Sequence, residues 1–127
     1  MAITRFEFQV VGNIVVPGAE SSPLNVIAPN VASASFQKGD VLIFRAKDGD
    51  VSLVFSHEAL YALEIHDKTP FTLTKASPIS FEVKKKSSGN CCVTATPAGK
   101  AADISCTSVP AGILEIWWPV PTDPAQT

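Results

Sequence analysis

The sequence predicts an all-β fold, an antiparallel Greek-key β-sandwich of about seven to ten strands, from three observations. Ten prolines and seven glycines divide the 127 residues into short segments. These segments are rich in Val, Ile, Phe and Thr, the residue types that favour strands. Phe6, Phe8 and Val10 alternate with charged or polar residues, and this period of two is typical of a half-buried strand.

Further candidate strands follow along the chain, separated by turns that carry Gly, Pro, Asn or Asp. They span residues 14–16, 24–28, 32–37, 41–46, 51–56, 71–75, 79–84, 91–96, 103–107 and 113–118. The dipeptide Asp48-Gly49 between two apolar runs predicts a β-hairpin, because both central residues of the favoured turn need a positive φ. The run Lys84-Lys85-Lys86 stands before Ser-Ser-Gly and predicts a solvated turn between strands.

The segment from Ser56 to His66 fits two structures. Ser56 stands in an N-cap position, Glu58 places acidic charge in the first turn, and good helix formers follow. The later residues of the segment also alternate between apolar and polar, as in a strand. We expect one short helix near residues 57–62, with one or two turns around Glu58, and then a strand that runs into His66.

The length and apolar content of the chain predict one soluble globular domain. We place it at residues 1–118 and expect the proline-rich residues 119–127 to form an extended or disordered tail. A formal charge of −2 leaves no basic groove for nucleic acid, and no apolar run is long enough for a membrane span. The N-terminus lacks signal-peptide features, which predicts a cytoplasmic protein; a processed secreted form, or secretion by a route without a signal peptide, is the alternative.

The three cysteines are Cys91, Cys92 and Cys106. If Ala98-Gly99 forms a two-residue turn, Cys91 lies opposite Cys106 and both point inward, whereas Cys92 points outward. Two interpretations of the facing pair remain open. One is a Cys91–Cys106 disulfide, which needs oxidising conditions, and the other is two free thiols in the core. In both, Cys92 is expected to be a lone exposed thiol.

The residues that a metal would use are His57, His66, Cys91 and Cys106. Neither C-x-x-C nor H-x-x-x-H spacing occurs, and Tyr61 stands where a zincin helix starting at His57 would carry its second histidine. The sequence also contains no Gly-x-Ser-x-Gly elbow and no glycine-rich phosphate loop. We therefore predict no metal site and no cofactor, and nothing in the sequence argues for an enzyme.

The neighbours Trp117 and Trp118 must face opposite sides of a strand. Trp118 shares the apolar face of Ile116, so Trp117 is the candidate exposed aromatic side chain, able to stack on a ligand or to insert into a partner. The alternative is that the proline-rich tail covers Trp117. Tyr61 is the second candidate ligand-binding aromatic residue.

Residues 35–44, with the turn Lys38-Gly39-Asp40, and residues 51–55 together resemble the cupredoxin pattern. In that family a Lys-Gly-Asp turn opens a strand with alternating apolar residues, and a second strand begins with a copper-binding histidine. Val51 stands at the position of that histidine, no histidine follows His66, and the only methionine is the first residue. The resemblance, which covers residues 35–55, therefore implies a cupredoxin-like sandwich without type 1 copper ligands.

These expectations favour a non-catalytic β-sandwich that serves as an interaction or structural module and presents loops or an edge strand to a protein partner. Self-association as a homodimer is a second expectation. One alternative function is a carbohydrate- or small-ligand-binding module that uses Trp117 and Tyr61. Another is a metal-dependent activity that uses His57, His66 and the cysteines.

Overall fold

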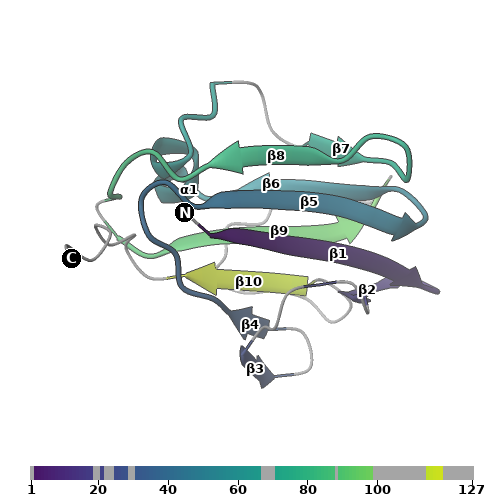
Figure 1. Ribbon diagram of the computed structural model, residues 1–127. Coiled ribbons are helices and arrows are strands. Elements are labelled where there is room, and N and C mark those ends of the chain that lie inside the picture. The colour runs from purple at the N-terminus through teal and green to yellow at the C-terminus, as the bar shows by residue number, and fades with distance from the viewer. Residues whose placement is uncertain are drawn as a thin grey trace.

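The computed structural model describes residues 2–18, 21, 25–28, 31–66, 71–87, 89–98 and 114–118 of the chain. These residues form ten strands and one short helix. The strands belong to two sheets that stack as layers, with the four-stranded sheet in front of β6, β9 and β10 in the view of Figure 1. The predicted all-β sandwich is thus confirmed. The predicted strand at 103–107 and the tail at 119–127 lie outside the described residues.

The four-stranded sheet has the order β2-β1-β5-β8. Its strands are β1 (Ile3–Val11), β2 (Ile14–Pro17), β5 (Val41–Asp48) and β8 (Ile79–Glu82). β1 pairs antiparallel with β2 but parallel with β5. A parallel pair needs a long connection that returns the chain to the same end of the sheet, and the chain forms β3 and β4 in the other sheet on the way.

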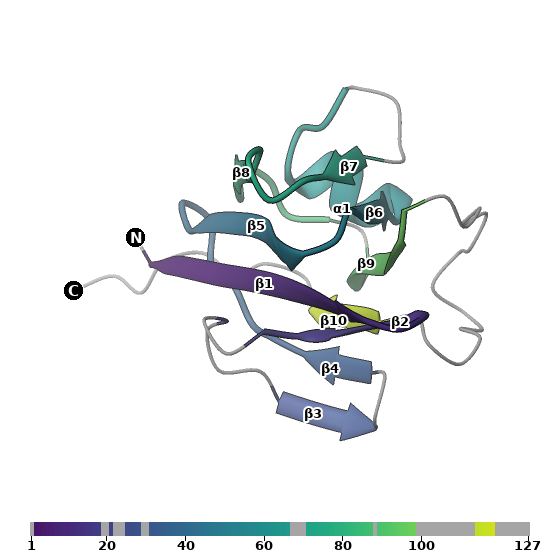
Figure 2. The same cartoon turned by 90° about the vertical axis from the view of Figure 1, so that its right-hand side faces the viewer.

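The six-stranded sheet has the order β3-β4-β10-β9-β6-β7, and Figure 2 shows it as the second layer. Its strands are β3 (Asn25–Ala28), β4 (Val31–Ser33), β10 (Leu114–Trp118), β9 (Cys91–Pro97), β6 (Val51–Phe55) and β7 (Phe71–Leu73). β10 is parallel to β4 and antiparallel to β9. Both sheets are therefore mixed, and the prediction of a strictly antiparallel Greek key is wrong in this respect.

The core between the sheets is largely aromatic. Phe6 and Phe8 on β1 are buried, as the alternation of the first strand predicts. The ring of Phe44 on β5 stacks on Phe6 at 4.9 Å between centroids and meets Phe55 of the other sheet edge-on at 5.6 Å. Edge-to-face and offset rings stabilise a core beyond their buried area, so these contacts hold the two layers together.

Two turns that contain glycine connect their strands in different ways. β1 and β2 form a hairpin through Gly12 and Asn13, and only Gly12 has a positive φ, as in a type II′ turn. The predicted hairpin at Asp48-Gly49 is wrong, because β5 and β6 belong to different sheets. Gly49 has a φ of 72° and lies close to the Val10 side chain, so it turns the chain from one layer into the other.

The Lys38-Gly39-Asp40 turn before β5 is held by a buried carboxylate. Asp40 accepts a hydrogen bond from the Gln37 N–H at 2.9 Å and another from the Ala2 N–H at 3.1 Å. Gly39 has a φ of 95°, a conformation that glycine adopts without steric cost. The turn motif therefore fastens the beginning of the chain to the start of β5.

The helix α1 (His57–Ala62) packs against β9 and β6. The Ser56 hydroxyl caps the helix by accepting from the Ala59 N–H and also accepts from the Cys92 N–H at 3.0 Å. The helix prediction is confirmed, but the strand expected to run into His66 is wrong. Leu63 is the C-cap and Glu64 turns into the left-handed region, so the chain leaves the helix through a tight turn.

Within the described part of the chain, no helix has the length and apolar character that crossing a membrane requires.

Candidate functional site

The histidines and cysteines do not assemble into a metal centre in the described part of the chain. His57 is the first residue of α1, His66 follows the helix, and both are exposed. No three His, Cys, Asp or Glu side chains among the described residues lie close enough together to hold a metal ion. Val51, at the position of the cupredoxin copper histidine, is fully buried and carries no donor atom. The residues present therefore do not fit a type 1 copper ligand at that position.

Cys91 is a free, fully buried thiol on the core side of β9. Its S–H donates to the Ser87 hydroxyl at 3.3 Å, and that hydroxyl donates to the Gly89 carbonyl oxygen at 2.6 Å. Burial raises the pKa of the Cys91 thiol, and the hydrogen bond between Cys91 and Ser87 offsets this only in part. Trp118 lies opposite Cys91 in the ladder. Its indole N–H also lowers the pKa of the Cys91 thiol, but by less than burial raises it. Cys91 is thus held as an unreactive thiol.

Of the two interpretations left open for Cys91, the free thiol in the core is confirmed and the Cys91–Cys106 disulfide is wrong. Cys92 is the disulfide-bonded residue and is buried, so the expectation of a lone exposed thiol is also wrong. The physical reason is that a strand has two edges, and those of β9 are taken by β6 and β10. A hairpin through Ala98-Gly99 would need a free edge of β9 for its second strand, and both edges are already paired. With Cys91 free, Cys106 is the remaining cysteine of the sequence, and it lies outside the described residues.

The two candidate aromatic residues differ in exposure. Trp117 is half-buried on β10, where it pairs with Cys92 on one side and Ser33 on the other. Trp118 lies in the core, as predicted. Tyr61 on α1 is 55% exposed, and the Lys85 ammonium lies 5.0 Å from the centre of its ring. Tyr61 is therefore the more accessible of the two candidates.

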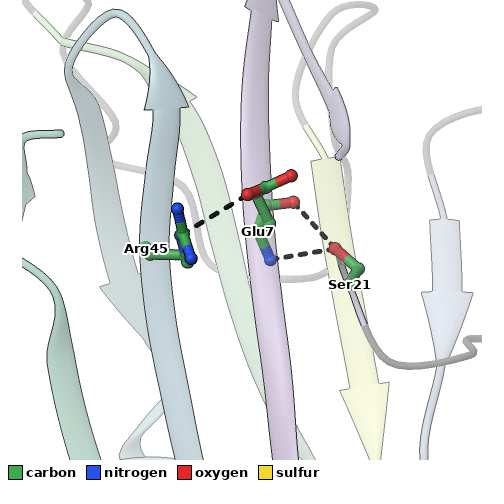
Figure 3. Close-up of polar contacts among 3 residues, drawn as sticks. All are labelled: Glu7, Ser21 and Arg45. Atoms are coloured by element: carbon green, nitrogen blue, oxygen red, sulfur yellow. Dashed lines mark hydrogen bonds and ion pairs between the residues drawn. The ribbon is translucent and has the colours of Figure 1, made fainter. Parts of the chain in front are cut away.

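A buried carboxylate on β1 was not expected from the sequence. Glu7 alternates with the core residues Phe6 and Phe8, so it points away from the space between the sheets, yet its side chain is only 1% exposed. One of its oxygens lies 3.4 Å from Nε of Arg45 on the neighbouring strand β5. Figure 3 shows this ion pair together with Ser21 on the other side of β1.

The Ser21 hydroxyl makes the hydrogen bonds to the Glu7 backbone that a neighbouring strand would otherwise make. It accepts from the Glu7 N–H and donates to the Glu7 carbonyl oxygen, both at 2.9 Å (Figure 3). The Gly18 N–H donates to the same carbonyl at 2.7 Å. β2 ends at Pro17, so these contacts satisfy the edge of β1 beyond the end of its partner. This arrangement stabilises the edge of the sheet.

A second polar cluster joins the end of α1 to the segment after β8. We call it the Glu64 surface and define it as Tyr61, Glu64, Lys84 and Lys85. The Glu64 carboxylate lies 3.2 Å from the Lys85 ammonium and 3.6 Å from that of Lys84. A hydrogen bond from Lys85 is the main reason why the pKa of Glu64 is lowered. The predicted solvated turn at 84–86 is thus exposed, and two of its lysines converge on one carboxylate.

Glu64 has an unusual backbone conformation. Its φ of 51° makes it the one non-glycine residue with a positive φ in the described part of the chain. The Glu64 N–H donates to the Tyr61 carbonyl and the Ile65 N–H to the Leu60 carbonyl, which is the Schellman pattern of a helix end. Glycine is the usual residue at this position, and another residue costs roughly 1 kcal/mol there.

Neither cluster could be read directly from the sequence. Glu7 has the alternation of an exposed strand residue, and Gly18, which packs against its side chain, stands eleven positions later. In the sequence Lys84 and Lys85 form only part of a charged run, and the alternation around Glu64 predicts a strand. One signal for a strained helix end was present in the sequence. No glycine follows the helix predicted near residues 57–62, although glycine is the usual residue where a helix ends in a left-handed turn.

Comparisons with protein-family models, with curated proteins and with solved structures find no match to this chain.

Proposed function

We propose that the chain is a non-catalytic interaction module that binds a protein partner through the Glu64 surface. The observation that carries this proposal is the exposure of Tyr61 beside Lys85, which shares the Glu64 carboxylate with Lys84. Tyrosine is enriched among the residues that dominate binding energy at protein interfaces. The nucleophilic and acidic groups in the interior support a non-catalytic role, since Cys91 is buried and Glu7 is paired with Arg45.

We include in this proposal that the scaffold is a cupredoxin-like sandwich without the copper ligands. The Lys38-Gly39-Asp40 turn leads into β5, and Val51 opens β6, in the order that the resemblance implies. A fold of this kind does not by itself specify an activity. The proposed function therefore depends on the surface and not on the scaffold.

The redox state of the cysteines bears on the cellular compartment in which such a module would function. The cytoplasmic location predicted from the sequence stays a prediction. The disulfide at Cys92 favours an oxidising compartment instead, because intracellular thiols are normally kept reduced.

Site-specific photo-crosslinking tests the proposed function. Benzoylphenylalanine at position 61, in cells that naturally produce the protein, should give discrete cross-linked protein bands, and the same label at the exposed Lys75 position should not. Bands of the size of a second copy would identify the homodimer, which sedimentation at high protein concentration would check independently. Equal bands from both positions, or none from position 61, would contradict the proposal.

Carbohydrate binding remains the alternative, favoured by the exposed ring of Tyr61. Stacking on a sugar needs an accessible ring face, and Lys85 already lies over the Tyr61 ring. A glycan array probed with the intact chain and with Tyr61→Ala separates the two functions. Binding that is lost in Tyr61→Ala would favour the carbohydrate module over the protein-binding one.

A further inference from the structure

The Glu64 surface holds an excess of positive charge. One carboxylate, Glu64, contacts the ammonium groups of both Lys84 and Lys85, and the two lysine side chains are 49% and 44% exposed. The chain as a whole has a formal charge of −2, so this local excess has the opposite sign to the protein. The Lys84 and Lys85 ammonium groups share a single carboxylate, so a second carboxylate from a binding partner would be attracted to them.

The Glu64 carboxylate is not needed to close the helix. The N–H groups of Leu63, Glu64 and Ile65 donate to carbonyl oxygens of α1, and the Ala62 carbonyl accepts from the backbone N–H groups of Lys84 and Lys85. These main-chain bonds would be the same with glycine at position 64. A glutamate in a strained left-handed conformation therefore indicates a role for its carboxylate beyond the helix end.

Tyr61 supplies an apolar surface beside these charges. Its ring is exposed and lies under the Lys85 ammonium, at 5.0 Å from the ring centre. A cation over an aromatic face fixes the position of the charge more firmly than a free lysine side chain would. The surface thus combines an ordered cation, a second cation and an aromatic ring, a combination suited to an acidic peptide with apolar side chains.

We propose that the Glu64 surface binds a carboxylate-rich segment of a partner protein, and that the Glu64 carboxylate occupies the position that a partner carboxylate takes on binding. This inference rests on the proposed function and adds the chemical class of the partner. A partner carboxylate pairs with Lys84 and Lys85, while neighbouring side chains of the partner pack on Tyr61. Glu64 acts as an internal competitor that weakens binding of poorly matched anions.

The experiment is a titration of the isotope-labelled intact chain with a hexaglutamate peptide, followed by NMR at low salt. Shifts should centre on the backbone amides of residues 60–65 and 84–86. Glu64→Gln removes the competing charge and should tighten binding at least about threefold. The double variant Lys84→Ala with Lys85→Ala should weaken it at least about tenfold, because both cations are lost.

A matched control removes the same charge elsewhere. Lys47 and Lys75 are exposed, and the double variant Lys47→Ala with Lys75→Ala should change the affinity less than about twofold. Thermal unfolding of every variant establishes that each is folded. Equal weakening by the two double variants would show unspecific charge attraction and overturn the inference, as would weaker binding by Glu64→Gln.

Two further outcomes separate this inference from the proposed function. Absence of hexaglutamate binding to both the natural chain and Glu64→Gln, with cross-linking from position 61 intact, would overturn the acidic partner and leave the interaction module standing. Tighter binding of tripolyphosphate than of hexaglutamate would overturn the assignment to carboxylates in favour of a phosphate-bearing ligand. Loss of both cross-linking and peptide binding would overturn the two proposals together.

Discussion

Gly18 packs directly against the side chain of Glu7, so that a β-carbon at position 18 would overlap the carboxylate oxygen Oε1. The Gly18 N–H also donates to the Glu7 carbonyl at 2.7 Å, which fixes the distance between the two backbones. The carboxylate lies between this backbone and Arg45. Only a residue without a side chain fits at position 18 unless the Glu7 side chain or one of the two backbones moves.

The first prediction concerns this close approach. Gly18→Ala should lower the free energy of unfolding by about 1–3 kcal/mol, because the added methyl group forces the Gly18 backbone or the Glu7 side chain to shift. Gly89→Ala is the matched control, since a β-carbon there meets Glu58 Cγ at an ordinary 3.8 Å and should change stability by less than about 0.5 kcal/mol. Urea unfolding measures both. Equal stabilities of the two variants would contradict the packing.

The second prediction concerns the hydroxyl that completes the edge of β1. Ser21→Ala removes two hydrogen bonds and leaves the Glu7 N–H without this partner, which should cost about 1–3 kcal/mol. Hydrogen exchange of the Glu7 amide should accelerate, whereas Ser80→Ala, at an exposed position on β8, should leave that amide unchanged. An unchanged exchange rate in Ser21→Ala would argue against the contact.

The third prediction concerns the thiols. Protein purified without reductant should show one free thiol, Cys91, which reacts with iodoacetamide only after unfolding, because the side chain is buried and its pKa is raised. Peptide mapping should find Cys92 linked to Cys106. Three reactive thiols in the native, unreduced protein, or a linked Cys91, would be the opposite result.

The fourth prediction concerns pH and Glu64. Its pKa is lowered from the ordinary value of 4.5, chiefly by the hydrogen bond from Lys85. A carboxyl group whose pKa is lower in the folded state stabilises the fold above its unfolded pKa, and this contribution disappears as the pH falls through the folded pKa. The difference in melting temperature between the natural chain and Glu64→Gln should therefore be present at neutral pH and vanish in acid below the lowered pKa. A difference that persists or grows in acid would contradict this assignment.

Local patterns predicted the parts of the fold that depend on neighbouring residues. The alternation around Phe6 and Phe8 placed the core face of β1 correctly, and the cap residue Ser56 identified the helix. The turn at Asp48-Gly49 was recognised as a turn, but its residues are the same whether the flanking strands pair with each other or enter different sheets. Local chemistry therefore cannot distinguish a hairpin from a crossing between layers.

The candidate sites depend on contacts between distant segments, which is why the sequence did not reveal them. Cys92 has the alternation of an outward-facing residue, but it is buried, as are Thr94 and Thr96 on the same face of β9. The Glu7 side chain is buried against Gly18, and Ser21 binds the Glu7 backbone. In both cases burial is decided by which segment arrives next to the strand, a choice that the strand's own residues do not encode.

The parallel pairing of β1 with β5 sets an order of events during synthesis. The first strand forms its ladder with residues from Val41 onward, so one edge of β1 stays unpaired until β5 has left the ribosome. Contacts between such distant positions slow folding, because a long loop must close before they form. The unpaired edge of β1 is consequently a place where the nascent chain is open to aggregation.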